Sequence, residues 1–149
     1  GETGASQPVS LLSAYSTPSQ GGTPGTALTF DRTGLAYGSD ISHTAGSNTF
    51  TINQPGVYSV SFHGVISPAP EDDSFPTNIV TSLTANGSVV PGASVPYNFQ
   101  NASDASDQSF TVPIAVSQTP TTLQMVVSGS NFLADAITMT ITRLGDIPS

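Results

Sequence analysis

The chain has 149 residues, 36% of them hydrophobic and 8% charged, with no cysteine and a formal net charge of -8 at pH 7. Because Arg32 and Arg143 are its only basic side chains, the composition excludes nucleic-acid binding by backbone neutralisation, basic membrane-binding patches, phosphate-binding lysine loops and Schiff-base lysines. The missing cysteine excludes disulfides, thiol nucleophiles and thiolate metal sites, and no apolar run reaches the roughly 18 residues of a membrane span.

Residues 1–6 form two consecutive Gly-X-Y triplets, and Gln7 breaks the repeat. Glycine at every third position is the signature of collagen. The repeat predicts that residues 1–8 are the remnant and lead-in of a collagen-like stalk. Residues 9–149 are then expected to form one globular domain, a length that buries about two thirds of its unfolded surface.

The first part of this domain alternates short apolar runs with loops. Residues 9–14 are a candidate strand, and residues 15–26 are a loop rich in Gly and Pro. A second short strand is expected at residues 27–30. Residues 31–47 are polar, with three residues that we expect to anchor the segment to the core: Leu35, Tyr37 and Ile41.

Residues 48–66 contain two alternating runs joined by Gln54-Pro55-Gly56, and we expect the rest of the fold to be organised around them. Proline presets φ at the first central position of a turn, and glycine accepts a positive φ at the next. The pattern predicts an antiparallel hairpin around a type II turn. Its core-facing residues are predicted to be Phe50, Ile52, Tyr58, Val60 and Phe62.

The opposite face of the second run consists of Val57, Ser59, Ser61, His63 and Val65. These side chains are small and, apart from a protonated His63, uncharged. Two interpretations stay open at this point. The face is either an ordinary uncharged surface, since much protein surface is apolar, or a subunit interface.

The next segment contains a second hairpin signal. Residues 67–77 are a proline-rich loop with the only acidic run of the chain. Residues 78–85 and 88–93 are predicted to pair around Asn86-Gly87, the strongest short-range signal for a hairpin. Residues 95–107 are expected to be mostly loop.

Three alternating strands are predicted at residues 109–116, 121–128 and 134–144. Pro113 indicates that the first of them lies at a sheet edge, contains a bulge, or has its N–H position at residue 113 facing away from the partner strand. Further core positions on these strands are predicted to be Phe110, Ile114, Ile137, Met139 and Ile141. About ten short strands without a convincing helix predict an all-β fold, a jelly-roll sandwich of antiparallel strands.

The spacing of Phe50, Gly56 and Tyr58, the Asn86-Gly87 turn and the closing run AITMTITRLG resemble the globular heads of the first complement component and of tumour-necrosis-factor (TNF) ligands. With the Gly-X-Y opening, the missing cysteine and the richness in Ser and Thr, the chain resembles more closely the C-terminal head of BclA-type bacterial collagen-like exosporium (spore-surface) glycoproteins. The resemblance covers roughly residues 9–146.

The resemblance implies a TNF-like jelly roll of ten strands that forms a tight homotrimer. It also implies that the outer side of the sheet around the central strand packs against neighbouring chains. The trimer-interface residues implied in this way are Val57, Ser59, Ser61, His63, Val65, Thr111, Pro113, Thr138, Thr140 and Thr142.

Enzyme chemistry has little support in the sequence. The chain has no G-x-S-x-G elbow, and neither His43 nor His63 has the context of a general base. Paired carboxylates suit glycosidases, and loop oxygens suit calcium, so two hypotheses stand beside the ordinary interpretation of solvated loops. The acidic candidates for both are Glu71, Asp72, Asp73, Asp104 and Asp107.

We therefore expect a structural, non-enzymatic trimerisation head of a collagen-like surface filament protein, without a cofactor unless calcium binds. It would nucleate the stalk and form the outer surface of a bacterial spore (the exosporium) or cell. The alternative is an adhesin module that binds a host receptor or glycan through loops at residues 67–77 and 95–107. We expect the chain to form a homotrimer, to bind no nucleic acid and not to insert into a membrane.

Overall fold

The computed structural model describes residues 9–71 and 74–149, so the predicted stalk remnant at residues 1–8 lies outside the described residues. Within them the chain forms twelve strands, and no helix is long and apolar enough to cross a membrane. In chain order the strands are β1 (Leu11–Ser16), β2 (Gln20–Gly22), β3 (Thr26–Ala27), β4 (Arg32–Tyr37), β5 (Ile41–Ser42), β6 (Phe50–Ile52), β7 (Gly56–Pro68), β8 (Thr77–Ala85), β9 (Ser88–Phe99), β10 (Ser106–Val116), β11 (Thr121–Ser128) and β12 (Phe132–Gly145).

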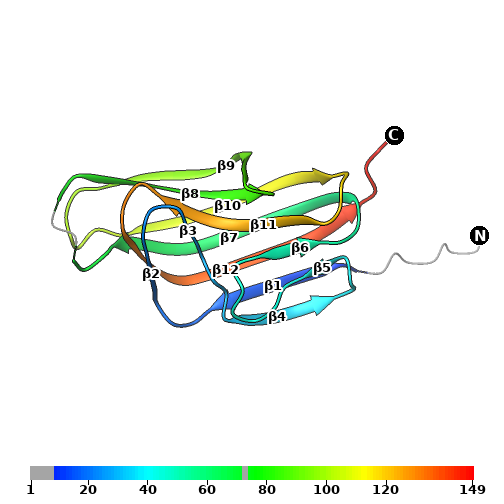
Figure 1. The fold of residues 1–149 in the computed structure, drawn as a ribbon, viewed down its shortest axis with the longest axis horizontal. Helices are drawn as coiled ribbons and strands as arrows, with labels where there is room; N and C mark the ends of the chain where they lie inside the picture. Colours follow the sequence, from blue (N-terminus) through cyan, green and yellow to red (C-terminus); the bar gives the residue numbers. More distant parts are fainter. Residues whose placement is uncertain (1–8, 72–73) are drawn as a thin grey trace, which may run out of the picture.

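The strands build two antiparallel sheets that pack face to face (Figure 1). The first sheet has the order β10-β7-β12-β1-β4, and β2 also pairs with β12. The second sheet has the order β5-β6-β11-β8-β9, and β3 also pairs with β11. Strand β1 begins and β12 ends at the same end of the sandwich (Figure 1). The all-β jelly roll predicted from the sequence is confirmed.

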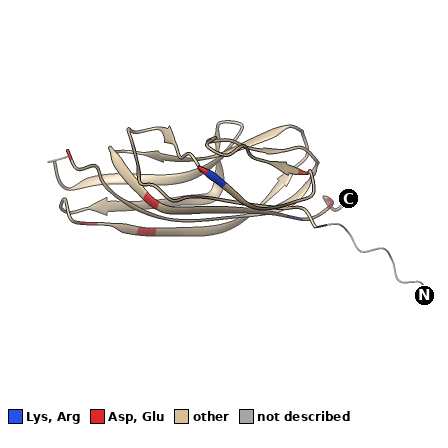
Figure 2. Ribbon diagram, turned by 90° about the horizontal axis from the view of Figure 1, so that it is seen from below, with Lys and Arg blue, Asp and Glu red and all other residues tan. Residues whose placement is uncertain are grey.

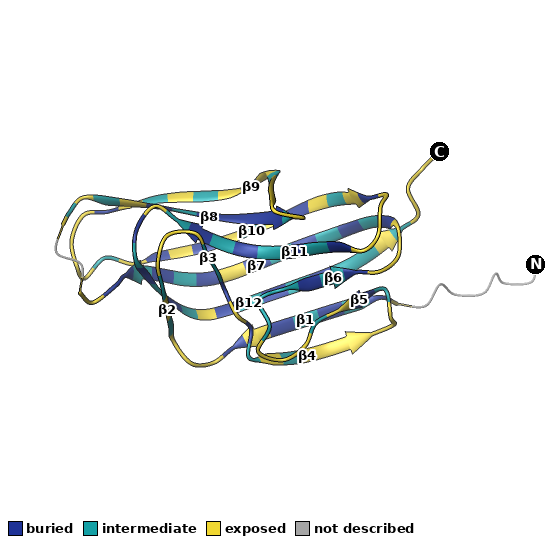
Figure 3. Ribbon diagram, viewed as in Figure 1, coloured by how far each residue is buried: buried dark blue, intermediate teal, exposed yellow. Residues whose placement is uncertain are grey.

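Alternation along the long strands fills the space between the sheets. In β7 every second residue is buried, and the intervening residues face away from the core (Figure 3). Buried aromatic and aliphatic side chains of this kind supply most of the free energy that favours folding. The largest of the fully buried side chains are Tyr58, Phe30, Phe50, Phe62, Phe99, Phe132, Leu28, Ile52, Ile66, Ile79, Leu83 and Leu123.

The predicted central hairpin is wrong. Strand β6 pairs with β5 and β11 in the second sheet, whereas β7 pairs with β10 and β12 in the first. Gly56 also lacks the positive φ that a type II turn requires. A Cβ at Gly56 would lie 2.6 Å from Nε of Arg143, so this close approach explains the glycine. Two strands whose apolar faces meet across the core show the same alternation as a hairpin.

Two further predictions, one of a loop and one of core anchors, are also wrong. Residues 95–99 belong to β9, so the predicted loop at residues 95–107 shrinks to residues 100–105. Residues 32–37 form β4, an edge strand that pairs with β1. Leu35 and Tyr37 are each 56% exposed and anchor nothing, whereas Ile41 is buried as expected. An edge strand exposes side chains that the sequence pattern alone assigns to the core.

The second predicted hairpin matches the structure. Strands β8 and β9 pair around Asn86 and Gly87, whose φ angles are 50° and 87°. Positive φ at both positions is the requirement of a type I′ turn. Strand β10 is an edge strand, as Pro113 predicts. On its inner face Phe110 and Ile114 are only partly buried, because they lie at the open edge of the sandwich.

Candidate functional site

The side of the first sheet that faces away from the core forms a continuous surface on three adjacent strands. We call it the outer face, and it consists of Val57, Ser59, Ser61, His63 and Val65 of β7, Thr111 and Pro113 of β10, and Thr138, Thr140 and Thr142 of β12. The pairing register sets these residues side by side: Ser61, for example, lies between Thr111 and Thr140. The residues that the family resemblance implies for the trimer interface therefore share one surface.

A β-bulge in β12 gives this strand its threonine face. The register with β7 shifts between Asp135 and Thr138, and Ala136 has a φ of 52°. One extra residue reverses the alternation, so Ile137 points into the core and Thr138 points outward. Without the bulge, the threonines of β12 would face the core.

The side chains of the outer face are mostly small and half-buried, and many of them carry hydroxyl groups. The Thr140 hydroxyl donates to Oγ of Ser13 on β1 at 3.2 Å, so hydroxyl groups continue onto the next strand. His63 is exposed, and its side chain makes no hydrogen bond or ion pair with the other described residues. Two carboxylates border the face at its Val65 end, because Asp107 of β10 and Asp135 of β12 are both paired with Val65. Arg32 lies on β4, and Figure 2 shows how few charged positions the described head has.

A groove opens at the β9–β10 edge of the sandwich, and nothing in the sequence pattern predicted it. We call it the edge groove; its volume is about 550 Å³. It lies where the β8–β9 turn leaves the last residues of β10 uncovered. Its lining residues are Ala85, Asn86, Val90, Pro91, Pro113, Ile114, Ala115, Val116, Ser117, Gln118 and Thr121. The prolines at positions 91 and 113 are the sequence signal that these two strands are edges.

A more open depression of about 540 Å³ lies beside the bulge, between β1, β7 and β12. Tyr15, His63 and Asp135 contribute to its lining. The Asp135 carboxylate accepts a hydrogen bond from the Ser19 hydroxyl, which holds it at the rim. This depression brings a ring, an imidazole and a carboxylate together with the hydroxyl groups of Ser16 and Thr17, and His63 makes no hydrogen bond with the other described residues.

Arg143 connects the chain segments that meet at the end of the head where β1 begins. Its guanidinium donates to the Pro55 carbonyl at 2.8 Å and to Asp146 at 2.7 Å, and it lies 3.7 Å from Asp40. The Asp40 carboxylate also accepts from the Ser10 hydroxyl at 2.8 Å. The bond to Asp146 raises the pKa of Arg143. We call this group the Arg143 clasp.

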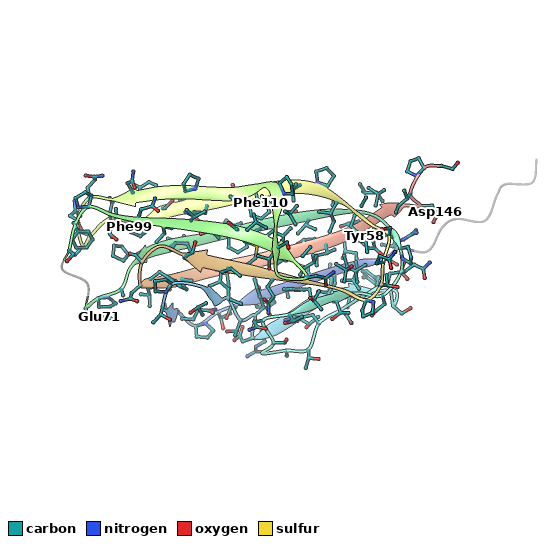
Figure 4. All side chains as sticks on the ribbon, turned by 45° about the horizontal axis from the view of Figure 1, so that its top comes forward. Tyr58, Glu71, Phe99, Phe110 and Asp146 are labelled. Atoms are coloured by element: carbon teal, nitrogen blue, oxygen red, sulfur yellow. The ribbon has the colours of Figure 1, made fainter. Side chains whose placement is uncertain are left out.

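The aromatic ring next to the clasp is part of the core. The Tyr58 hydroxyl donates to the Gln54 carbonyl. Burial is the larger cause and the negative charge of Asp40 the smaller cause that raise the pKa of Tyr58. Figure 4 shows Tyr58 and Asp146 at one end of the head and Glu71 at the opposite end. The clasp thus marks the end at which the chain enters and leaves the domain.

The acidic candidates for catalysis or calcium binding are dispersed. The Asp104 carboxylate accepts hydrogen bonds from the Gln100 backbone N–H at 2.9 Å and from the Tyr97 hydroxyl at 3.1 Å. The hydrogen bond from the Gln100 N–H lowers the pKa of Asp104. Asp107 lies on β10, and Glu71 is exposed. Asp72 and Asp73 lie outside the described residues. Within residues 9–71 and 74–149, no three carboxylate or histidine side chains are grouped to hold a metal ion.

His43 has a structural role in the second sheet. Its ring stacks on Phe50 with the centroids 4.4 Å apart. The Nε2 atom donates to the Ser47 carbonyl at 3.0 Å, and Nδ1 forms a hydrogen bond with the Thr33 hydroxyl at 3.0 Å. These contacts occupy both ring nitrogens, so no nitrogen is left for substrate chemistry.

Comparisons with known proteins identify the architecture. No family model and no curated protein matches the sequence. Among solved structures, murine APRIL aligns with a TM-score of 0.61 and 11% identity over 91% of this chain and 99% of that one. Eiger TNF from S. frugiperda aligns with a TM-score of 0.62 and 9% identity over 96% and 97% of the two chains. The chain therefore has a TNF-like jelly-roll fold.

Proposed function

We propose that this chain is the trimerisation head of a collagen-like surface filament protein of the BclA type, with a structural rather than enzymatic role. The observation that carries the proposal is the outer face, whose ten residues on three strands carry no permanent charge in a chain of net charge -8, with the nearest carboxylates, Asp107 and Asp135, at its Val65 end. Surfaces that stay in water normally carry charge, and cores of subunit interfaces are depleted of it. An uncharged contact face also separates the acidic groups of neighbouring chains.

The two Gly-X-Y triplets at residues 1–6 support the collagen-like part of the proposal. They precede β1, and β1 starts at the end of the head that holds the Arg143 clasp. Three stalk segments joined to one trimeric head have a high effective concentration, so nucleation of a triple helix becomes intramolecular. The opposite end, with the loop at Glu71, would then point away from the stalk as the outer surface of a spore or cell.

The solution mass of the chain tests the proposal directly. We expect light scattering at micromolar protein to give three times the mass of one chain, and the trimer to persist on dilution towards nanomolar protein. Since each chain repels its neighbours with a net charge of -8, added salt should strengthen assembly. A monomer at micromolar concentration in physiological salt would overturn the proposal.

A charged substitution on the outer face tests whether this surface forms the trimer. Ser61 lies between Thr111 and Thr140, and Ser61→Asp would bury one unpaired carboxylate per chain in a trimer, which costs several kcal/mol. We expect a folded monomer. The matched control is Thr44→Asp on an exposed loop, which adds the same charge and should leave the trimer intact. Trimers that survive Ser61→Asp would exclude this face as the interface.

A further inference from the structure

The two edges of the first sheet carry different side chains without partners. On β4, Tyr37 is 56% exposed, and Arg32 is exposed and makes no ion pair with the other described residues. On β10, at the opposite edge, Asp107 is exposed and likewise makes no side-chain hydrogen bond with described residues. The edge groove with Pro113 lies on the same side of the molecule. One edge therefore presents a cation and a ring, and the other a carboxylate and an apolar groove.

The pairing register shows that these features lie at matching levels along the strands. One row across the sheet, from β4 to β10, is Arg32, Tyr15, Thr138, His63 and Ser109. A second row is Tyr37, Leu11, Thr142, Ser59 and Pro113. Directly paired residues point to the same face, so Arg32 and Tyr37 belong to the side of the sheet that carries the outer face. Asp107 lies one pleat beyond Ser109, about 7 Å along β10.

Rotational symmetry turns this match into contacts between chains. A patch that differs from its partner patch can only form a heterologous contact, and such contacts close into a ring when the rotation allows it. Rotation about an axis that runs along the strands keeps every residue at its own level. The β4 edge of one chain then meets the β10 edge of the next at the same level, with Arg32 near Asp107 and Tyr37 near Pro113.

We infer that Arg32 and Tyr37 of one chain bind Asp107 and the edge groove of a second copy of this chain, an inference that rests on the proposed trimer. The Tyr37 ring inserts into the apolar part of the groove, where tyrosine is a frequent source of interface affinity. The Arg32 guanidinium pairs with the Asp107 carboxylate at the rim, where a charge pair sets orientation and association rate.

The small number of basic residues makes Arg32 important in this contact. The chain has two basic residues, and the other, Arg143, is already bonded to Asp146 in the clasp. Of the two arginines, Arg32 is therefore the one that can meet an acidic neighbour. Its position on the β4 edge favours the head-to-tail arrangement over contacts between identical edges, because two β10 edges would bring two Asp107 carboxylates together.

Charge reversal tests the ion pair. We expect Arg32→Asp and Asp107→Arg each to raise the concentration at which half of the protein is trimeric by about tenfold or more. The double variant should restore the wild-type value, because it re-forms the pair in the opposite direction. Glu71→Arg, at the opposite end from the clasp, changes the net charge by the same amount as Asp107→Arg and is the matched control.

The outcome of this series separates two failures. A wild-type monomer would overturn the proposed function and this inference together. A wild-type trimer whose single reversals act no more strongly than Glu71→Arg, or whose double variant is not restored, would overturn this inference alone.

Cross-linking tests the Tyr37 contact without relying on a destabilising substitution. The chain has no cysteine, so Tyr37→Cys with Pro113→Cys introduces the only thiols. Four strand spacings separate the two positions within one chain, about 19 Å, so a shorter bismaleimide joins them only between chains. We expect covalent dimers and trimers on a denaturing gel. The control pairs Tyr37→Cys with Asn98→Cys, an exposed position at the other end of β9 from the edge groove, and equal cross-linking of both pairs would overturn the assignment.

Discussion

Strand β7 has no room for a side chain at Gly64. A Cβ there would lie 2.7 Å from Cγ2 of Ile137 and 3.0 Å from Cζ of Phe62. Ile137 is 1% exposed and Phe62 is 2% exposed, so neither can swing into solvent. Insertion of a methyl group into a closed core costs about 1–3 kcal/mol, and we expect Gly64→Ala to lower the free energy of unfolding by that amount.

Urea denaturation at one fixed protomer concentration measures the effect, because assembly makes apparent stability depend on concentration. The control is Gly21→Ala on β2, where the nearest atom to a new Cβ is 3.7 Å away and the residue is exposed. Its unfolding free energy should change by no more than about 0.5 kcal/mol.

A double-mutant cycle shows whether the cost comes from the contact with Ile137. Ile137→Ala removes the Cγ2 methyl and alone should cost about 2–5 kcal/mol through the cavity that it leaves. The alanine at position 64 then fills part of that cavity. The double variant should therefore be less destabilised than the sum of the single variants by about 1 kcal/mol or more. Strict additivity, or a Gly64→Ala protein as stable as Gly21→Ala, would refute the reasoning.

Three further predictions concern the clasp, a loop and a turn. Arg143→Met removes the charge-assisted hydrogen bonds to the Pro55 carbonyl and Asp146, and should lower the free energy of unfolding by about 2 kcal/mol in urea. The folded-state pKa of Asp104 is lowered, so its contribution to stability is present above the unfolded pKa of about 3.9 and is lost as pH falls through the folded value. Unfolding curves across a pH series should therefore show wild type and Asp104→Asn differing at pH 7 and converging in acid. Gly87 has a φ of 87° with open space around it, so Gly87→Ala should cost about 1 kcal/mol through backbone strain alone, as measured by thermal unfolding.

The sequence predicted best where a single residue type is demanded by the backbone or by the core. Asn86-Gly87 gave the β8–β9 hairpin, because few other residues accept two successive positive φ angles. The alternation in residues 57–66 gave the buried face of β7, because a strand has a period of two in any sheet.

The sequence predicted least well which strands are neighbours. Two apolar faces that meet across a core look the same in the sequence as two faces of one hairpin, so the pattern pairs residues 50–52 with the wrong strand. An apolar residue on an edge strand looks the same as a core residue, so the pattern predicts that Tyr37 anchors the segment although it is exposed. Both errors concern contacts between segments that are distant in sequence, about which a local pattern holds no information.

The edge groove could not be predicted from the sequence for the same reason. It depends on how far the β8–β9 turn extends over β10, which is a matter of relative strand length in two different sheets. Only the prolines of these strands hinted that the two edges are special.

The alternation of β7 also separates fold from assembly. Tyr58, Val60 and Phe62 pack in the core, whereas Ser59 and Ser61 between them point away from the core and do not pack in it. Substitutions on the outer face can therefore change which surfaces associate without changing the jelly roll. This independence is consistent with a chain that has 11% identity to murine APRIL and the same jelly-roll architecture.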